Sequence, residues 1–407
     1  MSRLSAVLDR RAFLSSLAAT VGVWPAGATD TQSIRLPLPG GPNERALSTA
    51  FPGKGAMILQ RTRPPLLETP LEVFDQGVFT PNDRFFVRWH WAEIPTEIDA
   101  AAFRLRVRGH VERELSLSLD EIGRLPHVEI AAVNQCSGNS RGLFEPRVPG
   151  AQWAHGSMGN ARWMGVRLKD LLDRAGVRPG AVQVRFDGLD APVVPEAPDF
   201  RKSLNIDHAR DGEVMVAFAM NGEQLPLLNG FPLRLLVPGW YSTYWVKMLS
   251  DIEVLAYPDG QFWMKVAYRI PNTPGGSVRP SEIGYQTMPI SRMVPRAFLT
   301  NLAPNAVVKA GAPLPLRGIA LGGDCGVKAI TVSSDGGRTW LPTRLGSDEG
   351  RYSFRRFDVV LPAPRAGQVS LIARCTNAQD VTQPLEQTWN PNGFMRGGVE
   401  TVSVTAA

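Results

Sequence analysis

The residues Ile130-Ala-Ala-Val-Asn-Gln-Cys-Ser-Gly-Asn-Ser-Arg141 place a lone cysteine, Cys136, just beyond a short apolar run. The apolar run is typical of a strand, and the small polar residues after it are typical of a loop. A side chain at the end of a strand in such a loop can point into a functional site. Cys136 is therefore a candidate metal ligand or nucleophile, with a buried packing residue as the alternative.

Around this stretch, from about Leu71 to Leu255, short β-like runs alternate with helical ones. The expected elements are a period-two strand over Phe103–Arg108, a capping box at Ser118–Glu121, a helix over Val166–Ala175 that stops at Gly176, and a buried strand over Phe231–Pro238. Alternation identifies the first strand, and apolar residues at helical spacing identify the helix. The mixture predicts an α+β domain.

The segment between Arg269 and Pro295 is rich in proline and glycine and has little sustained periodicity, which is typical of a linker. Beyond it, short strand-like runs are separated by turn residues, and Ser334–Gly337 is a strong hairpin-turn signal. A region of roughly 120 residues with this pattern predicts a β-sandwich of the immunoglobulin-like type.

The composition is that of a globular protein. The chain has 407 residues, 43% hydrophobic and 20% charged, a length that favours two domains and a processed end. The net charge is +6, but the 44 basic and 38 acidic residues are mixed along the chain. This mixing argues against a nucleic-acid-binding arm, and leaves either a well-solvated surface or a local positive potential that attracts an anionic substrate.

The N-terminus has the features of an export signal. Arg10-Arg11 introduces an apolar stretch that ends near Trp24, and Pro25–Ala28 supplies small residues for cleavage. We expect a twin-arginine signal peptide over residues 1–28 and a periplasmic protein. No later apolar run reaches the roughly 18 residues that span a bilayer, so we expect no membrane span.

Cysteine usage narrows the cofactor classes. The three cysteines are Cys136, Cys325 and Cys375, and no Cys-x-x-Cys-His or paired Cys-x-x-Cys occurs. We therefore expect neither a covalent c-type haem nor a structural zinc in this chain. Cys325 and Cys375 are expected to be buried free thiols, with a disulfide between them as the alternative.

Upstream of Cys136, the residues Phe85-Phe-Val-Arg-Trp-His-Trp91 would alternate their side chains if extended. Arg88 and His90 would then share one face, opposite Val87, Trp89 and Trp91. Arginine offers a bidentate donor fork and histidine an adjustable proton, both suited to an anion. The alternative is a surface arginine beside a core histidine.

In order and spacing, these pieces resemble the sulfite oxidase family across nearly the whole mature chain. The matching motifs are Phe86-Val-Arg88-x-His90, Gln135-Cys136-x-Gly-Asn139, Trp153-x-x-Gly156, Ala161-Arg-Trp163, Gly188-Leu-Asp190, Asn221-Gly222, Gly230-Phe-Pro-x-Arg234, Val237-Pro-Gly239, Val246-Lys247, Ser333-x-Asp-Gly-Gly-x-Thr-Trp340 and Trp389-Asn390. The resemblance implies a molybdenum-cofactor catalytic domain over residues 29–285 and an immunoglobulin-like dimerisation-type domain over residues 286–407.

The resemblance also implies roles for individual residues. Cys136 matches the cysteine whose thiolate binds molybdenum beside the two sulfurs of one pterin dithiolene, and a soft thiolate suits that metal. The residues implied to form the catalytic pocket are Arg88, His90, Arg141, Trp153 and Tyr268. Tyr268 is implied to support proton-coupled electron transfer near the metal oxygens.

A second set of residues is implied to contact the molybdopterin. It consists of Phe86, Arg88, His90, Cys136, Asp190, Asn229, Arg234, Trp245, Val246 and Lys247. Here the chain departs from the animal enzymes, because Asn229 replaces a histidine and Tyr244-Trp245 replace a smaller, basic pair. For the arginine that the family's C-terminal domain supplies near the substrate, Arg396 is a candidate.

The implied reaction converts sulfite and water to sulfate and leaves two electrons on the metal. Without a haem in this chain, we expect the electrons to pass one at a time to a c-type cytochrome, in a homodimer or in a heterodimer with a cytochrome subunit. The closest alternative is a sulfane-sulfur dehydrogenase subunit of a thiosulfate-oxidising system. An alternative of another class is a cofactor-free exported binding module.

Overall fold

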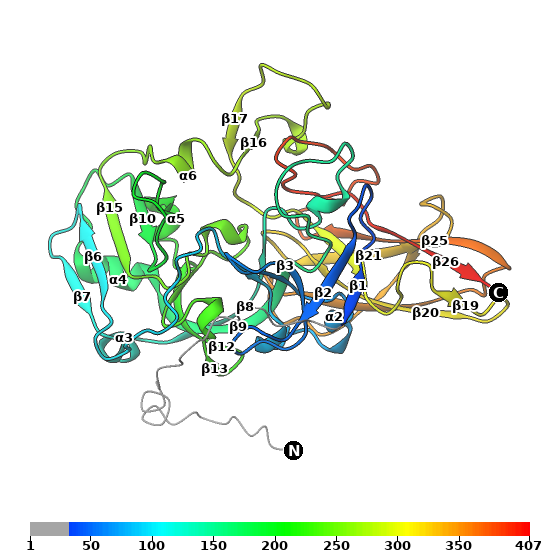
Figure 1. The fold of residues 1–407 in the computed structure, drawn as a ribbon, viewed down its shortest axis with the longest axis horizontal. Helices are drawn as coiled ribbons and strands as arrows, with labels where there is room; N and C mark the ends of the chain where they lie inside the picture. Colours follow the sequence, from blue (N-terminus) through cyan, green and yellow to red (C-terminus); the bar gives the residue numbers. More distant parts are fainter. Residues whose placement is uncertain (1–31) are drawn as a thin grey trace.

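The structure is a computed structural model that describes residues 32–407, so the expected signal peptide at 1–28 lies outside the described residues. In Figure 1 a part that mixes helices and strands lies on the left, and the strands of the C-terminal part lie on the right. The α+β class predicted from the sequence, with a β-sandwich at the C-terminal end, is confirmed.

The first sheet leads the chain toward Arg88. It has the order β1-β2-β3-β4-β5, and its strands are β1 (Ser33–Arg35), β2 (Glu44–Ser48), β3 (Met57–Arg61), β4 (Leu66–Glu68) and β5 (Val87–Arg88). The sequence signals did not reveal these strands, because they are short and neither β1 nor β2 alternates between buried and exposed residues. Of residues 85–91, which were expected to be extended, only Val87–Arg88 form a strand, and this strand pairs with Leu66–Leu67.

The second sheet carries Cys136 just beyond the end of its edge strand. Its strands are β8 (Val128–Gln135), β9 (Met158–Arg167), β12 (Met215–Met220), β13 (Glu223–Gln224) and β14 (Arg234–Leu236). β8 and β9 are antiparallel along their length, and Gln135 pairs with Met158 at the end where the Cys136 loop begins. β14 is shorter than the strand expected over Phe231–Pro238, because Pro232 has no N–H to give to a ladder.

A third sheet and the short helices complete this part. The sheet has the order β11-β10-β15-β6-β7 and consists of β6 (Leu105–Gly109), β7 (Leu115–Leu117), β10 (Gln183–Asp187), β11 (Lys202–Asn205) and β15 (Asp251–Leu255). The helices are α2 (Val73–Gln76), α3 (Leu119–Gly123), α4 (Leu168–Ala175), α5 (Ile206–Ala209) and α6 (Phe262–Lys265). β6 begins two residues later than expected.

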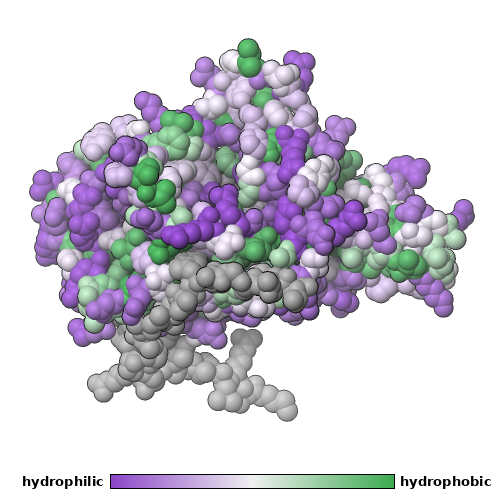
Figure 2. All heavy atoms as spheres, in the orientation of Figure 1, coloured by the Kyte–Doolittle hydropathy of each residue, from purple (hydrophilic) through white to green (hydrophobic). Residues whose placement is uncertain are grey.

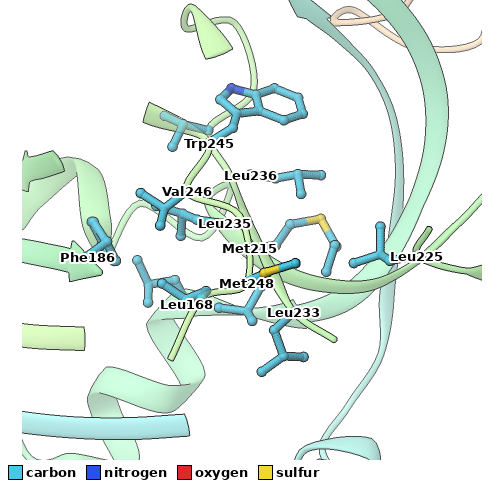
Figure 3. Packing of buried hydrophobic residues seen from close by; sticks show 14 of the residues in the cluster. Leu168, Phe186, Met215, Leu225, Leu233, Leu235, Leu236, Trp245, Val246 and Met248 are labelled. Carbon is cyan, nitrogen blue, oxygen red and sulfur yellow. The ribbon is translucent and has the colours of Figure 1, made fainter. Parts of the chain in front are cut away.

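The capping box and the helix stop at Gly176 are confirmed, whereas α4 begins at Leu168 and not at Val166, because Val166 and Arg167 still belong to β9. Ser118 caps α3 in a capping box: its hydroxyl accepts from Glu121 N at 3.2 Å, while its own N–H donates to the Glu121 carboxylate at 2.8 Å. α4 ends at Gly176, whose φ of 71° is the left-handed conformation of a helix C-cap. The apolar face of α4, including Leu168, packs into the main core beside β12 and β14 (Figure 3).

The proline- and glycine-rich segment contains more structure than a linker. It forms an antiparallel hairpin of β16 (Arg269–Pro271) and β17 (Thr287–Pro289), which projects from the body of the molecule in Figure 1. Tyr268 precedes β16 directly, and its carbonyl accepts from Ile290 N at 2.9 Å. The hairpin therefore fixes the chain on the C-terminal side of Tyr268.

The C-terminal strands form two facing sheets. One has the order β18-β20-β24-β23, with β18 (Arg296–Leu299), β20 (Leu314–Leu321), β23 (Arg344–Leu345) and β24 (Arg355–Leu361). The other has the order β19-β26-β25-β21-β22, with β19 (Val307–Val308), β21 (Val327–Ser333), β22 (Leu341–Pro342), β25 (Gly367–Asn377) and β26 (Thr401–Ala406). Apolar residues of both sheets share one core.

The turn predicted at Ser334–Gly337 joins β21 to β22. Cys325 and Cys375 are buried free thiols.

The outer surface is predominantly polar, with small apolar groups scattered over the face shown in Figure 2. Among residues 32–407, no helix is long and apolar enough to cross a bilayer.

Candidate active site

The loop after β8 turns back sharply and is held by backbone hydrogen bonds. Cys136 N donates to Ser157 O at 2.9 Å, Asn139 N donates to Cys136 O at 2.9 Å, and Arg141 N donates to Gly138 O at 3.0 Å. Ser140 takes a φ of 65°. A Cβ on Gly138 would lie 2.6 Å from the guanidinium of Arg141, so any larger residue there would displace this guanidinium from its place over the turn.

Two adjoining cavities meet at Cys136. Residues that line both are Arg88, His90, Cys136, Ser137 and Tyr268. The inner cavity is also lined by Phe86, Asn134, Asn229, Arg234, Trp245 and Lys247. The outer cavity, of about 310 Å³, is also lined by Arg141, Trp153, Asn392 and Phe394. The thiol thus lies where a group bound in the inner cavity would meet a small molecule in the outer one.

The inner cavity contains buried positive charge with little negative charge to balance it. Burial lowers the pKa of Arg234 to about 9. Burial, and then the charge of Arg234, lower the pKa of Lys247. A buried cation without a carboxylate at hydrogen-bonding distance is costly, so this cavity is suited to an anionic ligand.

Several buried polar atoms around the inner cavity have no hydrogen-bond partner within the described chain. They are Arg88 Nη1, His90 Nδ1, Asn134 Nδ2, Ser137 Oγ, Arg234 Nε and Thr243 Oγ1. Buried polar groups in proteins are nearly always paired, so an unpaired cluster around one cavity indicates a polar ligand. The set is rich in donors, which matches a ligand with phosphate and carbonyl oxygens.

The outer cavity presents two arginines and a tryptophan. Arg141 donates from Nε to Asn392 O at 3.0 Å, which leaves its terminal nitrogens for another acceptor. Burial lowers the pKa of Arg141, although the nearby Cys136 and Tyr268 oppose this. Arg88 has a buried, unpaired nitrogen, and Trp153 is fully buried. A small oxyanion between the two guanidinium groups would satisfy them.

His90 and Tyr268 form a short contact between residues far apart in the sequence. His90 Nε2 lies 2.5 Å from Tyr268 Oη. Burial and the charges of Arg88, Lys247 and Lys202 hold the pKa of His90 well below its usual value. Burial also raises the pKa of Tyr268. The pair therefore consists of a neutral imidazole and a protonated phenol at neutral pH.

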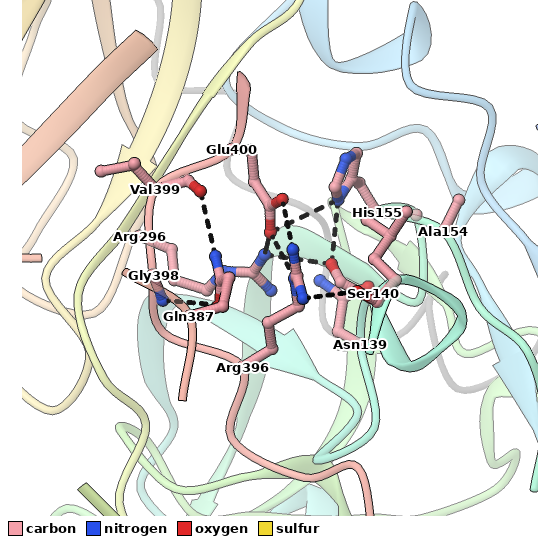
Figure 4. A network of polar contacts seen from close by, with 12 residues as sticks. Asn139, Ser140, Ala154, His155, Arg296, Gln387, Arg396, Gly398, Val399 and Glu400 are labelled. Atoms are coloured by element: carbon pink, nitrogen blue, oxygen red, sulfur yellow. Dashed lines mark hydrogen bonds and ion pairs between the residues drawn. The ribbon is translucent and has the colours of Figure 1, made fainter. Parts of the chain in front are cut away.

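Three residues expected at the site do not line either cavity. Val246 lies in the main hydrophobic core, as Figure 3 shows. Asp190 is buried, and its pKa is raised by burial against the opposing charge of Lys247. Arg396 pairs with Glu400 (Figure 4) and also donates to Leu143 O at 2.8 Å, so it has no free fork for a substrate.

Other residues at the site had no clear sequence signal. Lys54 is buried and donates to Asn82 O, to Phe85 O at 2.9 Å and to Asn229 Oδ1 at 2.5 Å, so it orients the Asn229 amide. Phe394 reaches the outer cavity from the C-terminal end of the chain. Neither residue could be found from local patterns, because every one of these contacts is long-range.

The geometry fits a metal that arrives with ligands of its own. Within residues 32–407, no group of three or more His, Cys, Asp and Glu side chains is arranged to hold a metal ion. Cys136 offers a single soft sulfur ligand next to a cavity suited to an anionic group.

Comparisons with known proteins agree with this geometry. Residues 91–263 match the family described as oxidoreductase molybdopterin binding domain, and residues 288–405 match the Mo-co oxidoreductase dimerisation domain. Sulfite oxidase of Gallus gallus is 32% identical over 346 residues, which cover 81% of this chain and 73% of that protein. The mitochondrial sulfite oxidase of Homo sapiens is 32% identical over 86% of this chain, which spans only 66% of the human protein.

Among solved structures, the sulfane dehydrogenase SoxCD of Paracoccus pantotrophus matches with a TM-score of 0.72 and 24% identity, covering 83% of this chain and 84% of that one. This similarity shows a shared fold. The family matches imply a molybdenum–molybdopterin cofactor, and the donors around the inner cavity fit such a group. The chain therefore belongs to the sulfite oxidase family of molybdenum oxidoreductases.

Proposed function

We propose that this protein oxidises sulfite to sulfate in the periplasm and passes the electrons one at a time to a c-type cytochrome. In the balanced reaction, sulfite and one water give sulfate, two protons and two electrons, and two cytochrome molecules each accept one electron. The observation that carries the proposal is the position of Cys136 between a donor-rich inner cavity and an outer cavity with two arginines.

The inner cavity would hold the molybdopterin. Cys136 would supply the protein's ligand to the metal, and Arg234, Lys247 and Asn229 would line the space for the pterin and its phosphate. When bound, the cofactor supplies a metal that accepts two electrons from the substrate and releases them singly. Phe86, His90 and Trp245 would form the remaining walls. Asp190 would act from behind Lys247, and Val246 would support Trp245 from the core.

The arginines would bind and orient the sulfite anion. Arg88 from β5 and Arg141 from the loop after β8 both line the outer cavity, so an oxyanion between them would receive charge-assisted hydrogen bonds from both side chains. Trp153 is fully buried against this cavity and would exclude bulk water from one side. Binding and orientation are therefore the main contributions of the protein.

His90 and Tyr268 would handle a proton during the reaction. The phenol of Tyr268 keeps its proton at neutral pH, and the neutral imidazole of His90 offers it a hydrogen-bond acceptor across the 2.5 Å contact. Because oxidation of sulfite with water releases two protons, a donor and an acceptor already in contact beside Cys136 suit this step. Tyr268 can also donate to an oxygen in the cavity when His90 donates to it.

Export and assembly are part of the same proposal. The paired arginines and the apolar stretch before Trp24 support transport by the twin-arginine route. The match of residues 288–405 to a dimerisation domain supports either a homodimer or docking of a cytochrome subunit. Light scattering of the purified protein, alone and with the cytochrome, separates these two assemblies.

The function is tested by steady-state reduction of cytochrome c with molybdenum-loaded protein and sulfite as the sole sulfur substrate. We expect sulfite-dependent reduction with two cytochrome molecules reduced per sulfite. Activity only with a sulfane-sulfur substrate would identify the sulfane dehydrogenase alternative instead. Purified protein without molybdenum, from cells able to make the cofactor, would favour a binding module.

A further inference from the structure

The C-terminal part of the chain returns to the active site through one short segment. Residues Asn390–Phe394 lie between β25 and β26, the last two strands of the sandwich. Phe394 lies in the wall of the outer cavity with 9% of its surface exposed. No other aromatic ring from beyond residue 300 lines either cavity in the described chain. Phe394 is thus the apolar contribution of this domain to the pocket.

The ring of Phe394 contacts two residues of the substrate pocket at once. Its centroid lies 5.4 Å from that of Tyr268, with only 6° between the ring planes. The central carbon of the Arg141 guanidinium lies 4.9 Å from the same centroid. Stacking and cation–π attraction therefore hold both side chains against one surface. A change in this ring would move the phenol and the guanidinium together.

The backbone that carries Phe394 has little freedom. Asn390 clamps the turn, since its side chain donates to Phe394 O at 2.8 Å and accepts from Phe394 N at 3.1 Å. Gly393 has a φ of 58°, and a Cβ there would lie 2.4 Å from Val148 Cγ2 and 2.8 Å from Arg141 Cγ. Met395 N donates to Ser137 O at 2.9 Å, next to Cys136. The position of the ring is therefore set by the clamp within its own segment and by the hydrogen bond to the Cys136 loop.

We propose that Phe394 is a specificity-determining residue of the oxyanion pocket. Its ring limits the size of the anion that fits beside Cys136 and keeps Arg141 in the orientation that binds it. This role of Phe394 deepens the proposed function. It rests on that function only where it takes the bound anion to be a sulfur oxyanion. The pocket would then favour small oxyanions over those that carry a bulky substituent.

The test compares anion binding by holoenzyme variants, measured by isothermal titration calorimetry with sulfate and with benzenesulfonate. Phe394→Leu removes the ring but keeps an apolar side chain, whereas Phe394→Tyr keeps the ring. Phe354→Leu is the matched control, because Phe354 is a fully buried ring of the same hydrophobic cluster that lines neither cavity. Molybdenum content and melting temperature are measured for each variant.

We expect Phe394→Leu to weaken sulfate binding about 3- to 10-fold, the size of one lost cation–π contact, and to strengthen benzenesulfonate binding. Phe394→Tyr and Phe354→Leu should leave both dissociation constants within about 2-fold, below the range of one such contact. The KM for sulfite should rise with the sulfate constant while kcat changes less. Unchanged sulfate binding in Phe394→Leu, or an equal effect in Phe354→Leu, would overturn the proposal.

The binding measurement also separates this proposal from the proposed function. If the unaltered protein binds sulfate but does not oxidise sulfite, the assignment of the reaction fails while the role of Phe394 is still decided by the calorimetry. If sulfite is oxidised but Phe394→Leu binds both anions as the unaltered protein does, only the role of Phe394 fails.

Discussion

Arg88 and Arg141 occupy different situations although both face the outer cavity. Arg141 is fixed by Asn392 O and by the ring of Phe394, whereas Arg88 retains a buried nitrogen without a partner in the described chain. An unpaired buried guanidinium nitrogen gains most from an arriving anion. Arg88 should therefore contribute more to substrate affinity than to stability.

We predict that Arg88→Met raises the KM for sulfite about 10-fold or more, because a charge-assisted hydrogen bond contributes roughly 1.5–3 kcal/mol. Steady-state kinetics at fixed ionic strength provide the measurement. Arg106→Met is the control, since Arg106 is an exposed arginine that pairs with Asp251 away from both cavities. An unchanged KM in Arg88→Met would remove this residue from the substrate pocket.

We predict that Tyr268→Phe slows electron departure from the metal more than reduction by sulfite. The variant loses the hydroxyl that lies 2.5 Å from His90 Nε2 and keeps the ring that stacks on Phe394. Rapid mixing with sulfite and flash-initiated transfer to a bound cytochrome measure the two steps separately. Proton-coupled steps respond strongly to such losses, so we expect roughly a tenfold or larger effect.

The control for this prediction is Tyr244→Phe. Tyr244 is also buried, but its hydroxyl donates to Ile290 O at 2.6 Å and does not contact His90. Its loss should lower stability and leave electron transfer intact. If Tyr268→Phe impairs only the reduction by sulfite, the residue acts on the substrate and its assigned role is wrong.

Glu68 predicts a pH dependence of stability. Its carboxylate accepts from Gly156 N at 2.8 Å and from Ala154 N at 3.2 Å, next to Trp153, and burial raises its pKa from 4.5 to about 7. Because the pKa is raised only in the folded state, the unfolded chain loses the Glu68 proton at a lower pH than the folded protein does. The contribution of Glu68 to stability is therefore full below pH 4.5 and is lost as the pH rises to about 7, by roughly 3 kcal/mol.

The measurement compares the unaltered protein with Glu68→Gln, which cannot ionise. The difference in unfolding free energy between the two proteins should change in favour of the variant as the pH rises from 4.5 to 7, and stay constant above that range. A difference that does not vary across this window would mean that Glu68 keeps an ordinary pKa.

At the scale of elements, the C-terminal domain holds the Cys136 loop through a buried ionic network, shown in Figure 4. Arg296, at the start of β18, pairs with Glu400 at 2.5 Å and donates to Ser140 Oγ at 3.0 Å. Arg396 pairs with the same carboxylate. Glu400 therefore lies between two arginines, one of which contacts the loop that carries Cys136.

We predict that Glu400→Gln lowers stability by about 3–5 kcal/mol, because it leaves two buried arginines without their carboxylate. It should also raise the KM for sulfite, since Ser140 directly precedes Arg141. Thermal unfolding and steady-state kinetics measure the two effects. Asp75→Asn is the control, because its pair with Arg317 also joins the two domains but lies on the surface, away from the loop. Equal effects of the two variants would contradict the proposed coupling.

The elements also show what the sequence could predict. Helix α4 and the capping box of α3 depend on residues within one or two turns, so local patterns are sufficient for them. The strand over Val87–Arg88 could not be delimited, because its partner Leu66–Leu67 lies in a sheet with no strong alternation. The hairpin β16–β17 was concealed by the prolines that indicate a linker.

At the scale of the whole molecule, the site combines parts that are distant in sequence. Motif resemblance predicted Cys136, Arg88, Arg141, Trp153 and Tyr268, and the structure brings all five around adjoining cavities. The contact of His90 with Tyr268 was not predictable, because it joins residues 178 positions apart in the sequence, and the wall formed by Phe394 was not, because it depends on how the two domains pack. The pairing of Arg396 with Glu400, which excludes it from the substrate pocket, could not be read from the sequence either.

The central claim is that Cys136 is the protein's ligand to molybdenum in a sulfite-oxidising site. Its most direct test is molybdenum K-edge X-ray absorption of the unaltered protein and of Cys136→Ser, together with sulfite-dependent cytochrome c reduction. We predict that both proteins fold and bind molybdenum, that the variant loses one sulfur neighbour of the metal, and that its turnover of sulfite almost disappears. An unchanged sulfur coordination with near-normal turnover in Cys136→Ser would contradict the claim.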